Sequence, residues 1–222
     1  MEYLTVAVPK GNLFDESLKL LEYIGFPANQ LKKEENRKLI FTDTRAKMKV
    51  VVTRNFDVPV YVEHGAADFG IVGKDVIAEM KPDVMELLDL RYGRCTLCLA
   101  GREKEDPKFL NNVRVATKYP NLASHFLSKE GIRARIIKLH GNIELAPLLG
   151  LSTYIVDLVA TGKTLKENNL SIIKPFFSSS ARLIANPFSW KLKRDSMLEF
   201  FEKARIYVEE RSGSNASGSH GT

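Results

Sequence analysis

From Ile155 to Leu165 the chain reads IVDLVATGKTL. Its first residues are apolar and rich in β-branched side chains around a single acid, Asp157, which is typical of a buried strand. Residues 160–164 then bring small side chains, two hydroxyls and a glycine, which is typical of a turn that leads into a helix. A strand followed by a turn and a helix is the repeating unit of parallel α/β sheets. This stretch therefore predicts an α/β fold.

The turn after this strand has the composition of a phosphate-binding loop. Gly162 lets the backbone turn so that several N–H groups converge on one oxyanion, and Thr161 and Thr164 add hydroxyl donors. Asp157 would repel phosphate, but its carboxylate could accept hydrogen bonds from sugar hydroxyls next to the bound phosphate. An acid followed by a hydroxyl-rich loop therefore suggests that the ligand is a phosphorylated ribose. An ordinary strand-to-helix turn, with Thr161 or Thr164 as N-cap, explains the same residues equally well.

The end of this turn also spells the end of a nucleoside-triphosphate P-loop, Gly162-Lys163-Thr164. That motif also needs a glycine five residues before Gly162, at position 157. Asp157 occupies the place, and a carboxylate there would repel phosphate. The sequence therefore disfavours a P-loop.

Strands and helices alternate along the rest of the chain, which indicates βαβ units. The runs that predict strands are residues 3–8, 38–41, 48–53, 68–73, 91–101, 113–116, 134–139, 154–159 and 182–185. The spacing of apolar residues predicts helices at 13–24, 60–64, 74–80, 122–129 and 143–149, and a final amphipathic helix with apolar positions between 197 and 208.

This order predicts two αβ lobes joined by a two-crossover hinge, a plan that resembles type II periplasmic binding proteins. Lobe I is discontinuous, with residues 1–92 plus 176–210, and lobe II is residues 93–175 with the candidate phosphate-binding loop. Ligands of such folds lie in the crevice between lobes, at the carboxyl ends of strands. Residues 211–222 are rich in Gly and Ser and are predicted to be a flexible tail or an appended sequence.

Composition excludes several classes of protein. The 222 residues are 44% hydrophobic with a net charge of +6, and no apolar run approaches the ~18 residues of a membrane-spanning helix. No secretory leader and no nucleic-acid-binding motif is visible. We therefore expect a cytoplasmic protein with neither a membrane nor a nucleic-acid partner. The basic run 191–194 is predicted to be a solvated helix start.

The cysteines, Cys95 and Cys98, lie on a predicted strand, where side chains three apart face opposite ways. No His or second Cys pair completes a zinc site. We predict buried structural thiols and no protein-held metal.

Two stretches, GNIELAPLLGL from Gly141 to Leu151 and the stretch from Ile155 to Leu165, together resemble the signature of the ATP phosphoribosyltransferase family. The similarity extends over about residues 3 to 208, and Asn12 stands where the family usually has Arg. Other segments that agree, in the family's order, are residues 9–11, 54–59, 67–73, 116–122 and 182–186.

The resemblance implies a glycosyltransferase of the phosphoribosyltransferase class that joins N1 of ATP to C1 of phosphoribosyl pyrophosphate and releases pyrophosphate. This is the first step of histidine biosynthesis. Attack by N1 needs no strong base, so catalysis consists of positioning and charge stabilisation. Mg²⁺ would be held mainly through the substrate pyrophosphate.

The chain also resembles the short form of the family, which works with a regulatory subunit that is similar to histidyl-tRNA synthetase. This implies a hetero-oligomer and a homodimer of this chain. A non-catalytic two-lobe protein that binds small ligands is the alternative, although the phosphate loop and the missing signal peptide speak against it.

The resemblance assigns roles to particular residues. Arg54, Asp157 and Glu144 are the catalytic candidates, with Asp157 and Glu144 on the ribose hydroxyls. Without the family, Glu144 would be an exposed acid in a helix's first turn, and Tyr119 can equally be a packing residue. The phosphoribosyl pyrophosphate site adds Ala160, Thr161, Gly162, Lys163, Thr164 and Leu165. The ATP site comprises Lys10, Gly11, Asn12, Leu13, Arg54, Lys118 and Tyr119. Lys10, Arg54, Lys118 and Lys163 are predicted to line one basic crevice.

Overall fold

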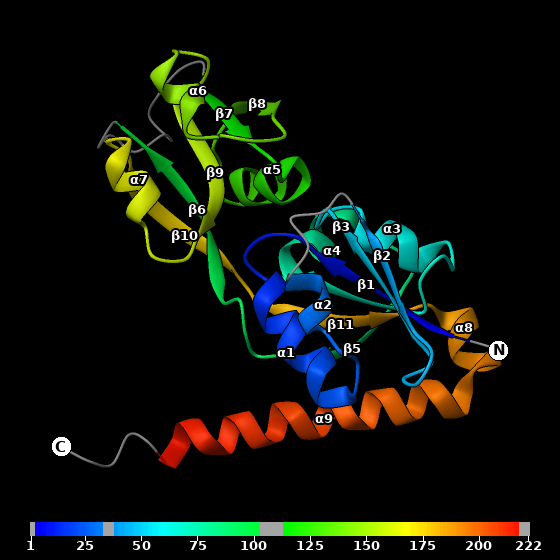
Figure 1. Ribbon diagram of the computed structural model, residues 1–222. Coiled ribbons are helices and arrows are strands. Elements are labelled where there is room, and N and C mark those ends of the chain that lie inside the picture. Colours follow the sequence, from blue (N-terminus) through cyan, green and yellow to red (C-terminus); the bar gives the residue numbers. More distant parts are fainter. Residues whose placement is uncertain (1–2, 33–37, 103–112, 218–222) are drawn as a thin grey trace. The chain divides into compact units, whose positions relative to one another are not determined.

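The computed structural model describes residues 3–32, 38–102 and 113–217, which form two sheets flanked by helices (Figure 1). The chain divides into two compact units. Unit 1 comprises Met1–Ile77, Pro82–Gly93 and Ser180–Thr222, and unit 2 comprises Ala78–Lys81 and Arg94–Ser179. Unit 1 is thus formed by three separate segments of the chain.

Unit 1 holds a six-stranded sheet in the order β2-β3-β1-β4-β11-β5. β1 runs parallel to β3 and β4, whereas β2, β11 and β5 are antiparallel to their neighbours. Its strands are β1 (Leu4–Pro9), β2 (Ile40–Asp43), β3 (Met48–Thr53), β4 (Phe69–Gly73), β5 (Met85–Asp89) and β11 (Ala181–Ala185).

Alternation along β1 gives unit 1 a core on each face of its sheet. Val6 and Val8 belong to the cluster that contains Leu18 of α1, whereas Ala7 packs with Val58 and Val62 of α3 on the other face. The helices are α1 (Phe14–Ile24), α2 (Asn29–Lys32), α3 (Val58–Glu63), α4 (Lys74–Met80), α8 (Pro187–Leu192) and α9 (Arg194–Ser217). The last residues of α4, from Ala78, belong to unit 2.

Unit 2 holds a five-stranded sheet in the order β10-β6-β9-β7-β8. β7 is parallel to β8 and β9, and β6 is antiparallel to both of its neighbours. Leu165 of α7 packs with Ala116 and Ile155 of the sheet. The elements are β6 (Cys95–Gly101), β7 (Val113–Thr117), α5 (Pro120–Lys129), β8 (Ala134–Lys138), α6 (Leu145–Leu148), β9 (Tyr154–Val159), α7 (Lys163–Glu167) and β10 (Ser171–Ser179).

The boundaries differ from the sequence prediction at β10. We ended lobe II at residue 175, but β10 pairs with β6 from Ser171 to Ser179, so residues 176–179 belong to unit 2. Pro175 hides the strand in the sequence because proline has no N–H for the ladder. The strand accommodates it through register shifts beside Ile172 and Pro175.

The predicted tail is also wrong in part. Helix α9 continues to Ser217, and the Arg211 guanidinium donates hydrogen bonds to Glu16 of α1 and to the Tyr207 hydroxyl. These contacts extend the helix past residue 211, where we expected it to end. Residues 218–222 lie outside the described part of the chain.

The basic run 191–194 is not simply solvated. The Lys193 ammonium donates to the carboxylate of buried Asp68 at 3.1 Å and to the carbonyl of Tyr3 at 3.2 Å.

Within the part of the chain that the structure describes, none of the helices has both the length and the apolar character of a membrane span.

Candidate functional site

The carboxyl ends of three parallel strands meet at one edge of the unit 2 sheet. Thr117 at the end of β7 pairs with Val156 of β9, and the Leu139 N–H that follows β8 donates to the Thr117 carbonyl at 2.9 Å. The segments after these strands carry the predicted site residues of this unit. Parallel topology therefore gathers Lys118 and Asp157 at the same edge as the turn that follows β9.

The turn between β9 and α7 is open at its surface. Gly162 has φ 74°, the left-handed conformation that glycine adopts at no steric cost, and it is itself the N-cap of α7. Ala160, Thr161, Lys163 and Thr164 are exposed, whereas the Leu165 side chain is buried and anchors the turn.

The N-cap explanation left open by the sequence does not hold for this turn. Neither threonine is the N-cap, and no side chain of the described residues caps α7. The first N–H groups of a helix lack intrahelical partners. The turn therefore offers backbone and hydroxyl donors together to an anion.

The two acids of the predicted ribose site are half-buried. Asp157 lies on β9, and its Oδ1 accepts a hydrogen bond from the Leu158 N–H at 2.9 Å. Glu144 lies at the N-cap position of α6 but makes no capping hydrogen bond there. Its neighbours Ile143 and Ala146 pack in the same cluster as Leu165, which ties Glu144 to the base of the turn.

The loop after β7 is more enclosed. Lys118 is half-buried, and Tyr119 is 3% exposed, which is the packing role that the sequence left open for this tyrosine. The sequence reasoning missed Glu79, a buried residue that belongs to unit 2. Its two carboxylate oxygens accept hydrogen bonds from the N–H groups of Asn121 and Leu122, each at 2.9 Å. The start of α5 is therefore already occupied by an acid.

In unit 1, the segments after β1 and β3 lie side by side. Pro9 pairs with Thr53, and the Lys10 N–H donates to the Thr53 carbonyl at 2.8 Å, so Lys10 and Arg54 are neighbours. Both are exposed. The structure thus places these two cations together at the carboxyl edge of the unit 1 sheet.

The rest of the predicted ATP segment begins helix α1. Gly11 has φ 94° and, like Asn12, is exposed, whereas Leu13 is half-buried and packs against the core. Next to Arg54, the side-chain oxygen of Asn55 is buried without a hydrogen-bond partner in the described chain. The sequence reasoning assigned no role to Asn55, and only the burial of its oxygen draws attention to it.

The described residues contain neither a cluster of metal-ligating side chains nor a disulfide. No group of three or more His, Cys, Asp or Glu side chains there could hold a metal ion. Cys95 is half-buried and Cys98 is buried, both as free thiols. Burial raises the pKa of the Cys98 thiol.

These features define a class: an α/β protein of two units, one of which presents an exposed turn with hydrogen-bond donors beside two carboxylates. A model of the ATP phosphoribosyltransferase family matches residues 54–205. An ATP phosphoribosyltransferase of Thermoanaerobacter sp. (strain X514) is 47% identical over 209 residues, covering 94% of this chain and 98% of the relative. The chain belongs to the ATP phosphoribosyltransferase family, and its length fits the short form.

Solved structures agree with this assignment. A chain of the ATP phosphoribosyl transferase (HisG:HisZ) complex from Thermotoga maritima is 34% identical, with a TM-score of 0.80 over 93% of this chain and 99% of that one. The arginine-bound form of truncated ArgBP from T. maritima, at 15% identity and a TM-score of 0.54 over 94% of this chain and 95% of that one, shows the fold alone. The type II periplasmic-binding-protein fold expected from the sequence is confirmed, and the activity is the transfer of a phosphoribosyl group to ATP in histidine biosynthesis.

Proposed function

We propose that the turn at residues 160–165 holds the 5-phosphate of phosphoribosyl pyrophosphate and thereby anchors the sugar. The observation that carries this proposal is the uncapped start of α7 at Gly162, with Thr161 and Thr164 exposed around it. Backbone N–H groups that converge on one oxyanion bind phosphate. Asp157 and Glu144 then take the ribose hydroxyls, because ionised carboxylates accept hydrogen bonds from hydroxyl groups.

The two carboxylates also stabilise the reaction centre. When the bond between C1 and pyrophosphate breaks, positive charge develops on the ribose ring. Fixed negative groups beside that ring lower the barrier because they need no reorganisation at the moment of reaction. The adenine N1 has a free lone pair, so the chain needs no general base. The proposed mechanism therefore needs the carboxylates of Asp157 and Glu144 but no catalytic triad.

The cations of unit 1 take the polyphosphate charges in this proposal. Lys10 and Arg54 are exposed neighbours at one sheet edge. Arg54 presents a planar fork that matches phosphate oxygens, and Lys10 adds a point charge. Gly11 and Asn12 supply an exposed backbone beside them. In unit 2, Lys118 is the cation that we propose to bind the polyphosphate.

Magnesium enters this scheme as part of the substrate. A pyrophosphate group presents several hard oxygens, and Mg²⁺ commonly binds substrate phosphates with only one or two protein carboxylates. Asp157 and Glu144 are of the right chemical type to serve as such ligands. When bound, the ion would neutralise the departing pyrophosphate.

A partner subunit is proposed by analogy with a solved relative. The solved T. maritima relative is a HisG:HisZ complex. We therefore propose that this chain also works in a hetero-oligomer with a regulatory subunit that is similar to histidyl-tRNA synthetase. We further propose that two copies of this chain form a homodimer within that hetero-oligomer, and that the protein is cytoplasmic.

The test is an assay for phosphoribosyl-ATP with purified chain, with and without the regulatory subunit. We expect the double substitution Thr161→Ala with Thr164→Ala to raise the KM for phosphoribosyl pyrophosphate at least about tenfold, since two hydrogen bonds to a charged group are removed. Thr153→Ala, at the opposite end of β9, is the matched control and should leave that KM unchanged. Product formation with an unaltered KM in the double variant would refute the assigned turn, and no product under either condition would refute the reaction.

A further inference from the structure

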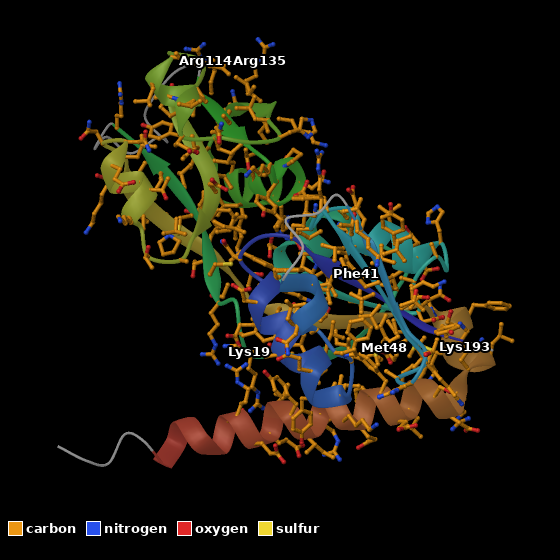
Figure 2. All side chains as sticks on the ribbon, in the orientation of Figure 1. Lys19, Phe41, Met48, Arg114, Arg135 and Lys193 are labelled. Carbon is orange, nitrogen blue, oxygen red and sulfur yellow. The ribbon has the colours of Figure 1, made fainter. Side chains whose placement is uncertain are left out.

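A cavity of about 350 Å³ lies in unit 1, at the opposite edge of its sheet from Lys10 and Arg54. Leu4 at the start of β1 and Met48 at the start of β3 line it, together with Phe200 of α9. Because β1 and β3 are parallel, Lys10 and Arg54 lie at their opposite ends. Six residues at about 3.3 Å each separate the two edges by roughly 20 Å. Figure 2 labels Met48 and Lys193, which both line the cavity.

The cavity carries an excess of positive charge. Two of its cations are matched: Lys193 by Asp68 at 3.1 Å, and Lys203 by Glu199 at 2.7 Å. The hydrogen bond from Lys203 also holds the pKa of Glu199 below its usual value. Arg45 and Lys47 line the cavity as well, and neither has an ion-pair partner within the described residues.

These two cations are presented by a well-defined turn. The Asp43 carboxylate accepts a hydrogen bond from the Ala46 N–H at 2.7 Å, and the Lys47 carbonyl accepts one from the Leu4 N–H at 3.0 Å. Lys47 has φ 48°, a left-handed conformation that few residues with a side chain adopt. The backbone therefore fixes where Arg45 and Lys47 leave the turn, which reduces the entropy lost when both bind one anion.

We propose that this cavity binds a small organic phosphate. Arg45 and Lys47 would hold the dianionic phosphate, and Leu4, Met48 and Phe200 would contact a compact apolar or aromatic body. An arginine fork beside a lysine is suited to phosphate oxygens. The volume lies at the lower end of the range for small-molecule sites, which limits the body to about one ring.

Methionine-methyl NMR tests the proposal on the full-length chain, because Met48 lines the cavity whereas Met80 and Met85 do not. The probe is phenyl phosphate, and the Met48 resonance is assigned with Met48→Leu. We expect a saturable shift of the Met48 methyl with Met80 and Met85 unmoved. The double substitution Arg45→Gln with Lys47→Gln should weaken that binding more than about tenfold, and added salt should weaken it in the wild type.

Matched controls separate this cavity from the catalytic turn. Lys163→Gln, in the turn after β9, should leave the Met48 titration unchanged. A Met48 methyl that does not respond, or a response that survives the double substitution, would overturn the proposal. If phenol bound as tightly as phenyl phosphate, the cavity would not recognise the phosphate group. If inorganic phosphate bound as tightly, the cavity would not recognise the apolar body. Arg45 and Lys47 are exposed, so the double variant is expected to fold.

Discussion

Helices α5 and α7 of unit 2 both begin after a parallel strand, but the N–H groups at their first turns have different partners. Each follows a parallel strand, β7 or β9, at the same edge of the sheet (Figure 1). At α5 the Glu79 carboxylate binds the N–H groups of Asn121 and Leu122. At α7 the N-cap is Gly162 and no described side chain caps the helix.

At the same sheet edge, one helix start therefore has a carboxylate partner, and the other has none among the described side chains. A carboxylate satisfies the start of α5, so that start contributes to stability and has no capacity left for an anion. The start of α7 keeps its donors available, at some expense in stability, because uncapped N–H groups are less favourable than capped ones. Four substitutions test this contrast, taken from the largest expected effect to the smallest.

Asp157→Asn should have the largest effect, because it removes the negative charge that we place beside the ribose. We expect kcat to fall by about 10²-fold, the usual consequence of losing one group that stabilises transition-state charge. Steady-state kinetics of phosphoribosyl-ATP formation measure this. Glu167→Gln is the control, since Glu167 is an exposed acid of α7 that faces Lys163 at 3.9 Å. A similar loss of kcat in both variants would contradict the special role of Asp157.

Glu79→Ala should act on stability. It leaves the Asn121 and Leu122 N–H groups without their acceptor, and we expect the free energy of unfolding to fall by about 2 kcal/mol. Urea denaturation measures the change. Glu79→Gln keeps one carbonyl acceptor and should lose about half as much. If the free energy of unfolding were unchanged in both variants, the Glu79 carboxylate would not stabilise the start of α5 and the contrast would fail.

Gly162→Ala should affect both stability and binding. The nearest atom to an added Cβ is Val159 Cγ1 at 3.8 Å, so the penalty comes from the left-handed φ of 74° rather than from a clash. We expect a loss of about 1 kcal/mol in stability and a higher KM for phosphoribosyl pyrophosphate. Gly131→Ala, with φ 73° and open space after α5, is the matched control. It should lose the same stability and keep its KM.

Lys163→Gln should have the smallest effect. The Lys163 side chain is 82% exposed and its ion pair with Glu167 is long, so it adds long-range attraction rather than a fixed contact. We expect the KM for phosphoribosyl pyrophosphate to rise two- to threefold, by about 0.5 kcal/mol, at low salt and to return to the wild-type value at about 0.5 M salt. An equal effect at both salt concentrations would indicate a direct contact with the phosphate.

The sequence predicted much of this arrangement because local patterns control it. The apolar run at 154–159 is confirmed as β9, and the final amphipathic helix has Met197, Phe200, Ala204 and Val208 buried as expected. The two-lobe fold is confirmed as well. By contrast, β10 was missed because Pro175 interrupts its pattern, although pairing with β6 outweighs that local preference.

What the sequence determined by itself is the class of fold, the family and the composition of the turn after β9, since strand periodicity, small turn residues and a long motif are all local in the chain. Only the tertiary structure decided which helix start is open. Glu79 and Asn121 lie 42 residues apart, so no local pattern joins them. The same holds for the contact of Arg211 with Glu16, 195 residues away. Long-range contacts depend on how elements pack, and packing selects among side chains that look alike in the sequence.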